Sequence, residues 1–303
     1  MSKPPFLEAE LMRKLERLTI ASKGRVRGTL QGKRRSRLLG SSLEFADFRP
    51  YAPGDDIRRI DWNVYGRTGK AFIRQYWDEQ ELTVRLYVDE SRSMRFGEIG
   101  GPNKLACALR LAACVGYSAL SGEDLVSAHS FADRMTATLP PIRGKGSAGR
   151  LFEYFERRLE DNSEDRIGSD DLSDAFLQPG ALPRKPGQSW LFTDGLYGSG
   201  LEQTLNAFAS ARQHLVFVQL LSPDELAPSL SGELKLIDSE SGAAKEVAIG
   251  RGVMAAYYAV LREHTESIRQ LCAERGFAYL LVDTSVPVAD TAVRALLSEG
   301  LLM

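Results

Sequence analysis

Residues 82–94 read LTVRLYVDESRSM and join an apolar half to a polar half. From Leu82 to Val88 apolar residues alternate with bulky, mostly β-forming neighbours, which predicts a strand deep in a sheet. Asp89, Ser91 and Ser93 follow at a spacing of two, so a carboxylate and two hydroxyls share one loop beyond the strand. Open α/β sheets bind ligands at this edge. These hard oxygen donors predict Mg²⁺, Mn²⁺ or Ca²⁺ rather than Zn²⁺, although a Ser-rich turn without a ligand has the same composition.

Strands and helices alternate along the chain from residue 82 onward. The expected strands are 125–131, 188–192, 215–221 and 278–282, and the expected helices include 105–120, 148–160 and 200–212. This alternation predicts an α/β fold, a doubly wound, mostly parallel sheet of the Rossmann-like kind with helices on both faces. Residues 232–249 predict a β-hairpin insertion that turns at Ser241–Gly242.

Two regions differ in character on either side of residue 80. We expect 81–303 to form the α/β domain. We expect 1–80 to be an N-terminal extension, with an amphipathic helix over 6–21, a basic loop and a small β-containing subdomain packed on the main domain.

The composition is that of an ordinary soluble protein, with 43% hydrophobic and 26% charged residues and a net charge of −1. No apolar leader is visible, and the longest apolar stretch, 105–120, is interrupted by Arg110, so we expect neither a secretory signal nor a membrane span. The odd set of cysteines lies in apolar surroundings, which favours reduced core thiols and a cytoplasmic location: Cys107, Cys114 and Cys272. The three histidines are scattered, which disfavours a zinc site or a histidine triad.

A basic segment covers residues 23–37 and contains no acidic side chain: Lys23, Arg25, Arg27, Lys33, Arg34, Arg35 and Arg37. Such a segment binds nucleic acid or an anionic surface, or is simply a solvated loop. No aromatic residues are interleaved for base stacking, so we expect no nucleic-acid partner.

A second dense stretch, residues 43–77, crowds opposite charges around the turn 52–55. One interpretation is a structural network of ion pairs that pins this segment to the sheet domain, because arginine prefers bidentate pairing with carboxylates. The other is a partner-binding surface built from Arg58, Arg59 and Trp62.

Oxygen donors also follow a second strand, because 188–192 ends in Thr193-Asp194-Gly195. The two loops together resemble the metal-ion-dependent adhesion site (MIDAS) of von Willebrand factor A-like domains. In that family one loop provides an Asp and two Ser, a middle loop a Thr, and the last strand an Asp. Asp89, Ser91, Ser93 and Asp194 match, but the middle loop, 168–172, has no Thr. Ser169 or Asp170 stands there instead, and a carboxylate would change the charge and preferred ion of the site.

Further motifs resemble the signature of the domain-of-unknown-function 58 family: Gly40, Glu44-Phe45, Arg49-Pro50-Tyr51, Gly54-Asp55-Asp56, Arg58, Ile60-Asp61-Trp62 and the DESRSM run. The resemblance covers most of the chain. Members are similar to von Willebrand factor A domains and typically occur with MoxR-type AAA+ ATPases. The resemblance therefore implies a non-enzymatic adaptor or co-chaperone that engages such an ATPase, or a client protein with an acidic side chain.

The implied mechanism uses a partly open magnesium site, in which a partner's carboxylate replaces a water on the ion. Asp89 would anchor the charge, Ser91 and Ser93 would be neutral ligands, and Asp194 would lie in the outer shell. One rival is a magnesium-dependent, phosphatase-like hydrolase with Asp89 as nucleophile, but Ser91 stands where that chemistry needs an acid. Another is a nucleic-acid or anionic-surface binder that uses residues 23–37.

Overall fold

The structure, a computed structural model, describes residues 6–20, 25–26, 35–36, 39–77, 82–95, 103–161, 169–230, 232–237, 244–295, 297 and 300–302. The chain divides into two compact units, residues 1–21 with 82–303 and residues 22–81. Helix α1 (Ala9–Leu15) is therefore part of the larger unit, whereas the division expected from the sequence placed it in the extension.

A six-stranded sheet forms the centre of the larger unit, in the order β12-β9-β8-β5-β6-β7. Its strands are β5 (Thr83–Asp89), β6 (Leu125–Phe131), β7 (Met135–Arg143), β8 (Gly187–Thr193), β9 (Gln213–Leu221) and β12 (Ala278–Asp283). All neighbours pair in parallel except β6 and β7, which are antiparallel. The predicted mostly parallel α/β sheet is confirmed.

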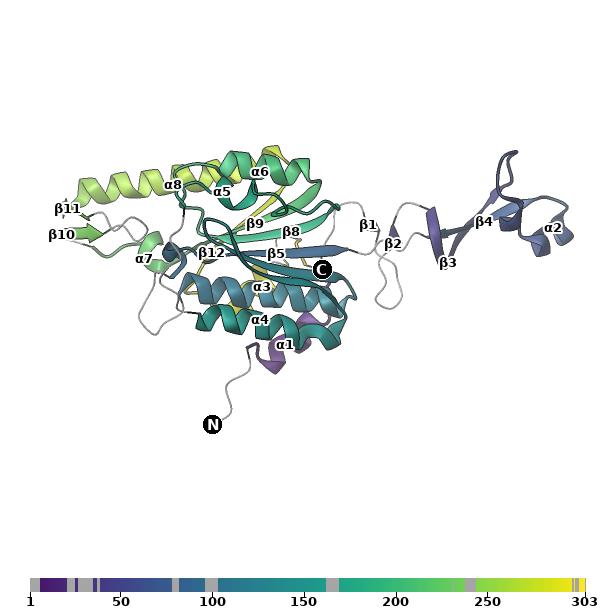
Figure 1. Ribbon diagram of the computed structural model, residues 1–303, viewed down its shortest axis with the longest axis horizontal. Coiled ribbons are helices and arrows are strands. Elements are labelled where there is room, and N and C mark those ends of the chain that lie inside the picture. Colours follow the sequence, from purple (N-terminus) through teal and green to yellow (C-terminus); the bar gives the residue numbers. More distant parts are fainter. Residues whose placement is uncertain are drawn as a thin grey trace. The chain divides into compact units, whose positions relative to one another are not determined.

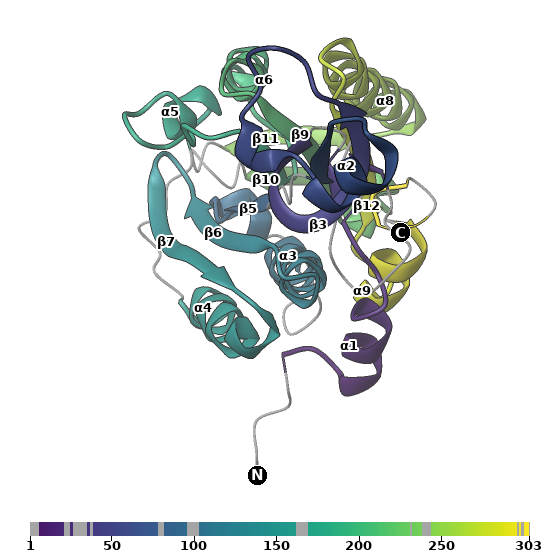
Figure 2. The same ribbon diagram turned by 90° about the vertical axis from the view of Figure 1, so that its right-hand side faces the viewer.

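Helices cover both faces of this sheet (Figure 2). One apolar core lies under α1, α3 (Lys104–Ser121), α4 (Ala148–Glu160) and the segment from α9 (Val288–Asp290) to Ala295. The other lies under α5 (Ser173–Phe176), α6 (Leu201–Ser210) and α8 (Arg251–Glu274). Strand β5 is buried from Val84 to Asp89, since it contributes to both cores.

Helix α3 is long and apolar enough to cross a membrane by length and composition, but 89% of it is buried inside the larger unit. Small residues allow this burial. A Cβ added to Gly116 would lie 2.6 Å from Leu151 Cδ2 and 2.9 Å from Leu86 Cδ1, so α3 packs against β5 and α4 at a distance that only glycine permits. Arg110 is exposed at the surface of this helix.

The order in which the chain adds strands to the sheet reverses at β5. The chain adds β6 and β7 on one side of β5, then returns to add β8, β9 and β12 on the other. The carboxyl ends of β5 and β8 are thus adjacent at the topological switch point, where α/β sheets bind ligands. Asp89 ends β5, and Asp194 directly follows β8.

An antiparallel pair, β10 (Gly232–Ile237) and β11 (Ala244–Ile249), forms the hairpin expected over 232–249. It lies between α7 (Pro223–Leu226), which follows β9, and the 24-residue helix α8. Figure 1 shows the hairpin, α7 and the start of α8 at one end of the larger unit.

The smaller unit is built on the antiparallel pair β3 (Leu39–Pro50) and β4 (Phe72–Trp77), joined through a short 3-10 turn (Ile57–Arg59) and α2 (Trp62–Thr68). Arg49 pairs with both oxygens of Asp55 at 2.6 Å, and Asp61 caps α2 while it pairs with Arg74 at 2.7 Å. These two ion pairs join residues of the smaller unit to one another, so the predicted pinning of this segment to the sheet domain stays a prediction.

Of the basic segment 23–37 the structure describes only β1 (Arg25–Val26) and β2 (Arg35–Ser36), which pair antiparallel. The rest of that segment lies outside the described residues, so its binding to an anionic surface stays a prediction.

Candidate functional site

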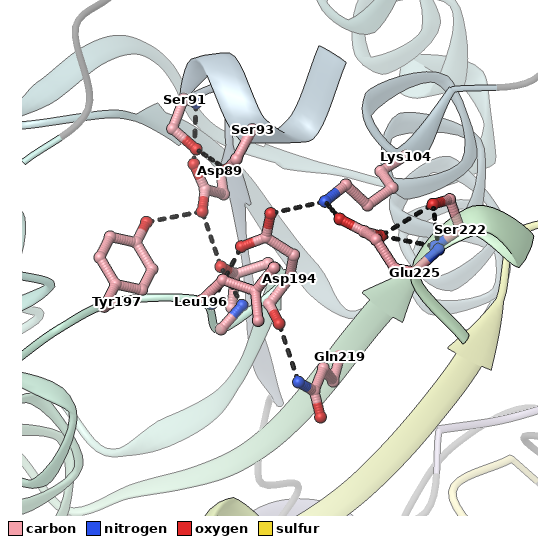
Figure 3. A network of polar contacts seen from close by, with 12 residues as sticks. Asp89, Ser91, Ser93, Lys104, Asp194, Leu196, Tyr197, Gln219, Ser222 and Glu225 are labelled. Atoms are coloured by element: carbon pink, nitrogen blue, oxygen red, sulfur yellow. Dashed lines mark hydrogen bonds and ion pairs between the residues drawn. The ribbon is translucent and has the colours of Figure 1, made fainter. Parts of the chain in front are cut away.

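Asp89 is fully buried at the end of β5 and is held by neutral donors. Its Oδ1 accepts a hydrogen bond from the backbone N–H of Ser91 at 2.8 Å. Its Oδ2 accepts from the hydroxyls of Thr193 and Tyr197, each at 2.6 Å (Figure 3). No lysine, arginine or histidine in the described ranges pairs with this carboxylate.

The environment of Asp89 opposes its negative charge. Burial is the largest cause and the charge of Asp194 the second, and together they raise the pKa of Asp89 to about 6. The hydrogen bonds from Thr193, Tyr197 and Ser91 act in the opposite direction but do not cancel the effect. A buried carboxylate without a counterion is costly, and such groups concentrate at functional sites.

Asp194 is equally buried but has a counterion. Its Oδ2 lies 2.7 Å from Lys104 Nζ, and its Oδ1 accepts from the backbone N–H of Leu196 at 3.1 Å. Gln219 donates to the Asp194 carbonyl at 2.8 Å, and Gly195 continues the chain with a φ of +69°, which favours glycine. Both carboxylate oxygens of Asp194 therefore have a donor in the protein.

Lys104, the first residue of α3, bridges two acids. Its ammonium lies 2.5 Å from Glu225 Oε1 in addition to its contact with Asp194. Glu225 Oε2 accepts from the backbone and hydroxyl of Ser222, which completes the capping box of α7. Burial alone would lower the pKa of Lys104, but the two carboxylates outweigh it and raise the pKa, so the lysine is charged.

The hydroxyls of Ser91 and Ser93 lie 3.1 Å apart, and Figure 3 shows them beside Asp89. Ser91 is buried and Ser93 half-buried, so this pair lies at the outer edge of the site. Asp89, Ser91 and Ser93 are brought together as the sequence predicts, with Asp194 next to them.

Glu90 lies between these residues in sequence but turns away from them. It forms a bidentate pair with Arg158 of α4, with both distances 2.8 Å, and accepts from Thr136 at 3.3 Å. The pair ties the loop after β5 to α4, so Glu90 is a structural anchor of the site.

The two middle-loop candidates make their contacts elsewhere. Ser169 donates to Asp174 at 2.5 Å, and Asp170 accepts from the backbone N–H of Gly198 at 3.0 Å. The first bond joins the loop before α5 to α5 itself and the second joins it to the loop after β8, and neither bond reaches Asp89. In the structure, Ser169 and Asp170 therefore stabilise the loop before α5, and their predicted part in metal binding stays a prediction.

The donor set fits a hard divalent cation. The described residues contain no group of three or more His, Cys, Asp or Glu side chains arranged for a metal, so any cation bound here would depend on hydroxyl oxygens as well as carboxylates. Asp89, Ser91 and Ser93 instead offer one carboxylate and two hydroxyls. Lys104 pairs with Asp194 and Glu225 but not with Asp89, so these three carboxylates and one ammonium sum to a charge of −2, which one divalent ion would neutralise.

Sequence reasoning missed Lys104, Tyr197 and Glu225. Two signals existed. A lysine opens a mostly apolar helix, against the helix dipole, and Ser222-Pro-Asp-Glu225 has the spacing of a capping box. Nothing in the sequence around Tyr197 marks it as a partner of Asp89.

Arg58, Arg59 and Trp62 lie at the surface of the smaller unit. Trp62 is 62% exposed and makes an edge-to-face contact with Tyr65, with ring centroids 5.9 Å apart. Arg58 lies 3.9 Å from Asp56, with both side chains exposed. Their predicted role in partner binding stays a prediction.

Comparison with known proteins finds relatives of unknown function. An uncharacterized protein of Mycobacterium bovis and one of Mycobacterium tuberculosis are each 29% identical over 247 residues, which is 80% of this chain and 75% of theirs. A solved structure of conserved hypothetical protein BatB from Bacteroides thetaiotaomicron aligns with 72% of this chain and 96% of its own, at 18% identity and a TM-score of 0.42. An aerotolerance-related membrane protein from Bacteroides fragilis aligns with 72% and 98%, at 17% identity and a TM-score of 0.39.

An uncharacterized membrane spanning protein from Vibrio fischeri aligns with 72% of this chain and 97% of its own, at 12% identity and a TM-score of 0.24. The descriptions of this protein and of the Bacteroides fragilis protein contradict the predicted cytoplasmic location. That prediction is wrong, and alignments this weak assign no other compartment. The argument from the cysteines fails too. Burial raises the pKa of Cys107 and Cys272 to about 12, and thiols shielded in this way do not indicate whether the surrounding compartment is oxidising or reducing.

One family match extends over most of the chain. Residues 47–267 match the family described as "Protein of unknown function DUF58", a range that runs from the end of β3 into α8 and includes strands β5 to β9 and the hairpin. This chain belongs to the DUF58 family.

Proposed function

We propose that this protein is a non-enzymatic interaction adaptor whose larger unit, a von Willebrand factor A-like domain, binds a partner through a divalent cation. The cation is Mg²⁺, or Mn²⁺ or Ca²⁺ in its place. Asp89, Ser91 and Ser93 hold it, and the partner contributes an acidic side chain. The partner is a MoxR-type AAA+ ATPase or a client protein of one.

A single observation carries the proposal. Asp89 is a fully buried carboxylate at a sheet's switch point, and its described partners are all neutral donors. A carboxylate kept only for stability is normally paired with a cation, as Asp194 and Glu90 are. The unpaired charge of Asp89 therefore supports a function in binding a cation.

The residues around Asp89 suit this function. Bound Mg²⁺ supplies a positive charge with coordination positions open to a partner's carboxylate. Ser91 and Ser93 add oxygen donors without adding negative charge, so the partner's carboxylate contributes strongly to neutralising the charge of the cation. Glu90 and Arg158 hold the loop in place, and exposed Leu196 borders the site beside Asp194.

The test is capture of partners from a cell extract by the immobilised full chain, with Mg²⁺ or with EDTA. We expect an ATPase of the MoxR type, or a client, to be retained with Mg²⁺ and lost with EDTA and in Asp89→Asn. Asp133→Asn is the matched control, since Asp133 is an exposed acid on the turn after β6 that pairs with Arg134. Capture that is equal with and without EDTA would refute the proposal, as would robust hydrolysis of a generic phosphate ester.

A further inference from the structure

Lys104 occupies a position that disfavours a lysine twice over. Its side chain is 0% exposed, and it opens a helix whose dipole places a partial positive charge at that end. Burial of an ammonium is costly unless acids surround it. Two acids do so here, from two other elements: Asp194 after β8 and Glu225 in α7.

The contact removes Asp194 from the ligands open to a cation. Asp194 Oδ2 is taken by the ammonium and Oδ1 by the backbone N–H of Leu196. Asp89 differs, because two of its three donors are hydroxyls, which can rotate and turn their lone pairs inward. An ammonium has no lone pair to offer and cannot yield in this way.

We propose that Lys104 is the residue that sets the strength and ion preference of the cation site, by acting as an internal cation that withholds Asp194 from direct coordination. This inference rests on the proposed function of the same site. With Lys104 present, one carboxylate and two hydroxyls hold the ion, and the protein alone binds it weakly. The partner's acid then completes the site, so that cation and partner bind together.

The bridge to Glu225 extends the effect beyond Asp194. Glu225 also caps α7 through Ser222, and the Tyr257 hydroxyl of α8 donates to the Glu225 carbonyl at 2.6 Å. Movement of Asp194 toward an ion would break the contact with Lys104 and disturb α7. The fold thus opposes direct coordination by Asp194.

The test measures Mn²⁺ affinity of the metal-free full chain, from the electron paramagnetic resonance signal of free Mn²⁺, for wild type and Lys104→Met. We expect at least about tenfold tighter binding in Lys104→Met, because a second carboxylate becomes free within reach of the ion. Lys145→Met is the matched control. Lys145 pairs with Glu16 at 2.8 Å on the surface, and its loss should leave the affinity unchanged.

Two further variants separate the inference from general damage. Lys104→Met/Glu225→Gln also removes the charge of Glu225, which Lys104→Met leaves without a counterion, and should keep the tighter Mn²⁺ binding in a better-folded protein. Lys104→Met/Asp194→Asn should lose the tighter Mn²⁺ binding. Circular dichroism confirms that each variant is folded.

The outcomes distinguish this inference from the proposed function. If wild type binds Mn²⁺ and a folded Lys104→Met variant binds it no more tightly, the inference about Lys104 is overturned and the cation site stands. If only variants without Lys104 bind Mn²⁺, the inference stands and the proposed function falls. If none of these proteins binds Mn²⁺, both are refuted.

Discussion

Asp89 and Asp194 begin from nearly the same position and end in different states. Each is an aspartate at the carboxyl end of a parallel strand, the two strands are neighbours, and both side chains are buried. Asp194 faces an ammonium, whereas Asp89 faces two hydroxyls and a backbone N–H. The difference teaches that the counterion, more than burial or sequence motif, separates a structural acid from one available to a ligand.

The two regions also differ in what joins them to the fold. The Lys104 side links α3, β8 and α7 through charged contacts. The Asp89 side is linked by the hydroxyls of Thr193, which ends β8, and of Tyr197 in the loop that follows, and no described cationic side chain pairs with Asp89. We expect the first region to respond to mutation as a structural ion pair and the second to respond to pH and cations.

The largest effect is expected from Lys104→Met in metal-free buffer. Buried Asp194 and partly buried Glu225 lose their counterion, and the breaking of a buried pair costs about 3–5 kcal/mol of unfolding free energy. Urea unfolding followed by circular dichroism measures it. Lys145→Met, which breaks a surface pair, should have a much smaller effect. Equal effects of the two variants would mean that the Lys104 contacts add no stability.

The second prediction concerns pH and Asp89. Its pKa is about 6 in the folded protein against an ordinary value of 3.8, so between pH 4 and 6 the folded state keeps a proton that the unfolded chain has lost. The contribution of Asp89 to stability therefore falls as pH rises through this window, by about 3 kcal/mol in total. His129 contributes in the opposite direction, because burial lowers its pKa to about 4, so the fall is read from metal-free unfolding at pH 4, 5, 6 and 7 as the difference between wild type and Asp89→Asn. A profile that Asp89→Asn leaves unaltered would contradict the assignment.

A smaller effect is expected from the hydroxyls on the two sides. Tyr197→Phe removes a donor to a charged carboxylate and should cost about 1.5–3 kcal/mol at pH 8, but less at pH 5, where Asp89 is protonated. Tyr257→Phe removes a donor to the neutral carbonyl of Glu225 and should cost about 0.5–1.5 kcal/mol at both pH values. Urea unfolding at the two pH values compares the two variants. A loss of stability in Tyr197→Phe that is the same at both pH values would mean that Tyr197 does not donate to a carboxylate that titrates between them.

Much of the fold and half of the site follow from local sequence patterns. The alternation of strands and helices predicts the sheet, and the polar residues after β5 and β8 predict a site, because parallel strands end at one edge. Asp89, Ser91, Ser93 and Asp194 come together for that reason.

The rest depends on contacts that no local pattern encodes. Lys104 and Glu225 are 121 residues apart, and three elements must pack before they meet. The resemblance to the metal-ion-dependent adhesion site implies Ser169 or Asp170 as a middle-loop ligand, whereas in the structure they bond Asp174 and Gly198. A sequence motif therefore predicts which side chains reach the carboxyl-end edge of the sheet. Tertiary packing determines which charged groups surround those side chains.

The most direct test compares Asp89→Asn with Asp194→Asn by urea unfolding at pH 7.5 in metal-free buffer. The substitutions are identical, so only the surroundings differ. We predict that Asp89→Asn stabilises the protein, by up to about 3 kcal/mol, because it removes an uncompensated buried charge. Asp194→Asn should destabilise it, because Lys104 loses a partner. Destabilisation of similar size by both substitutions would contradict the account.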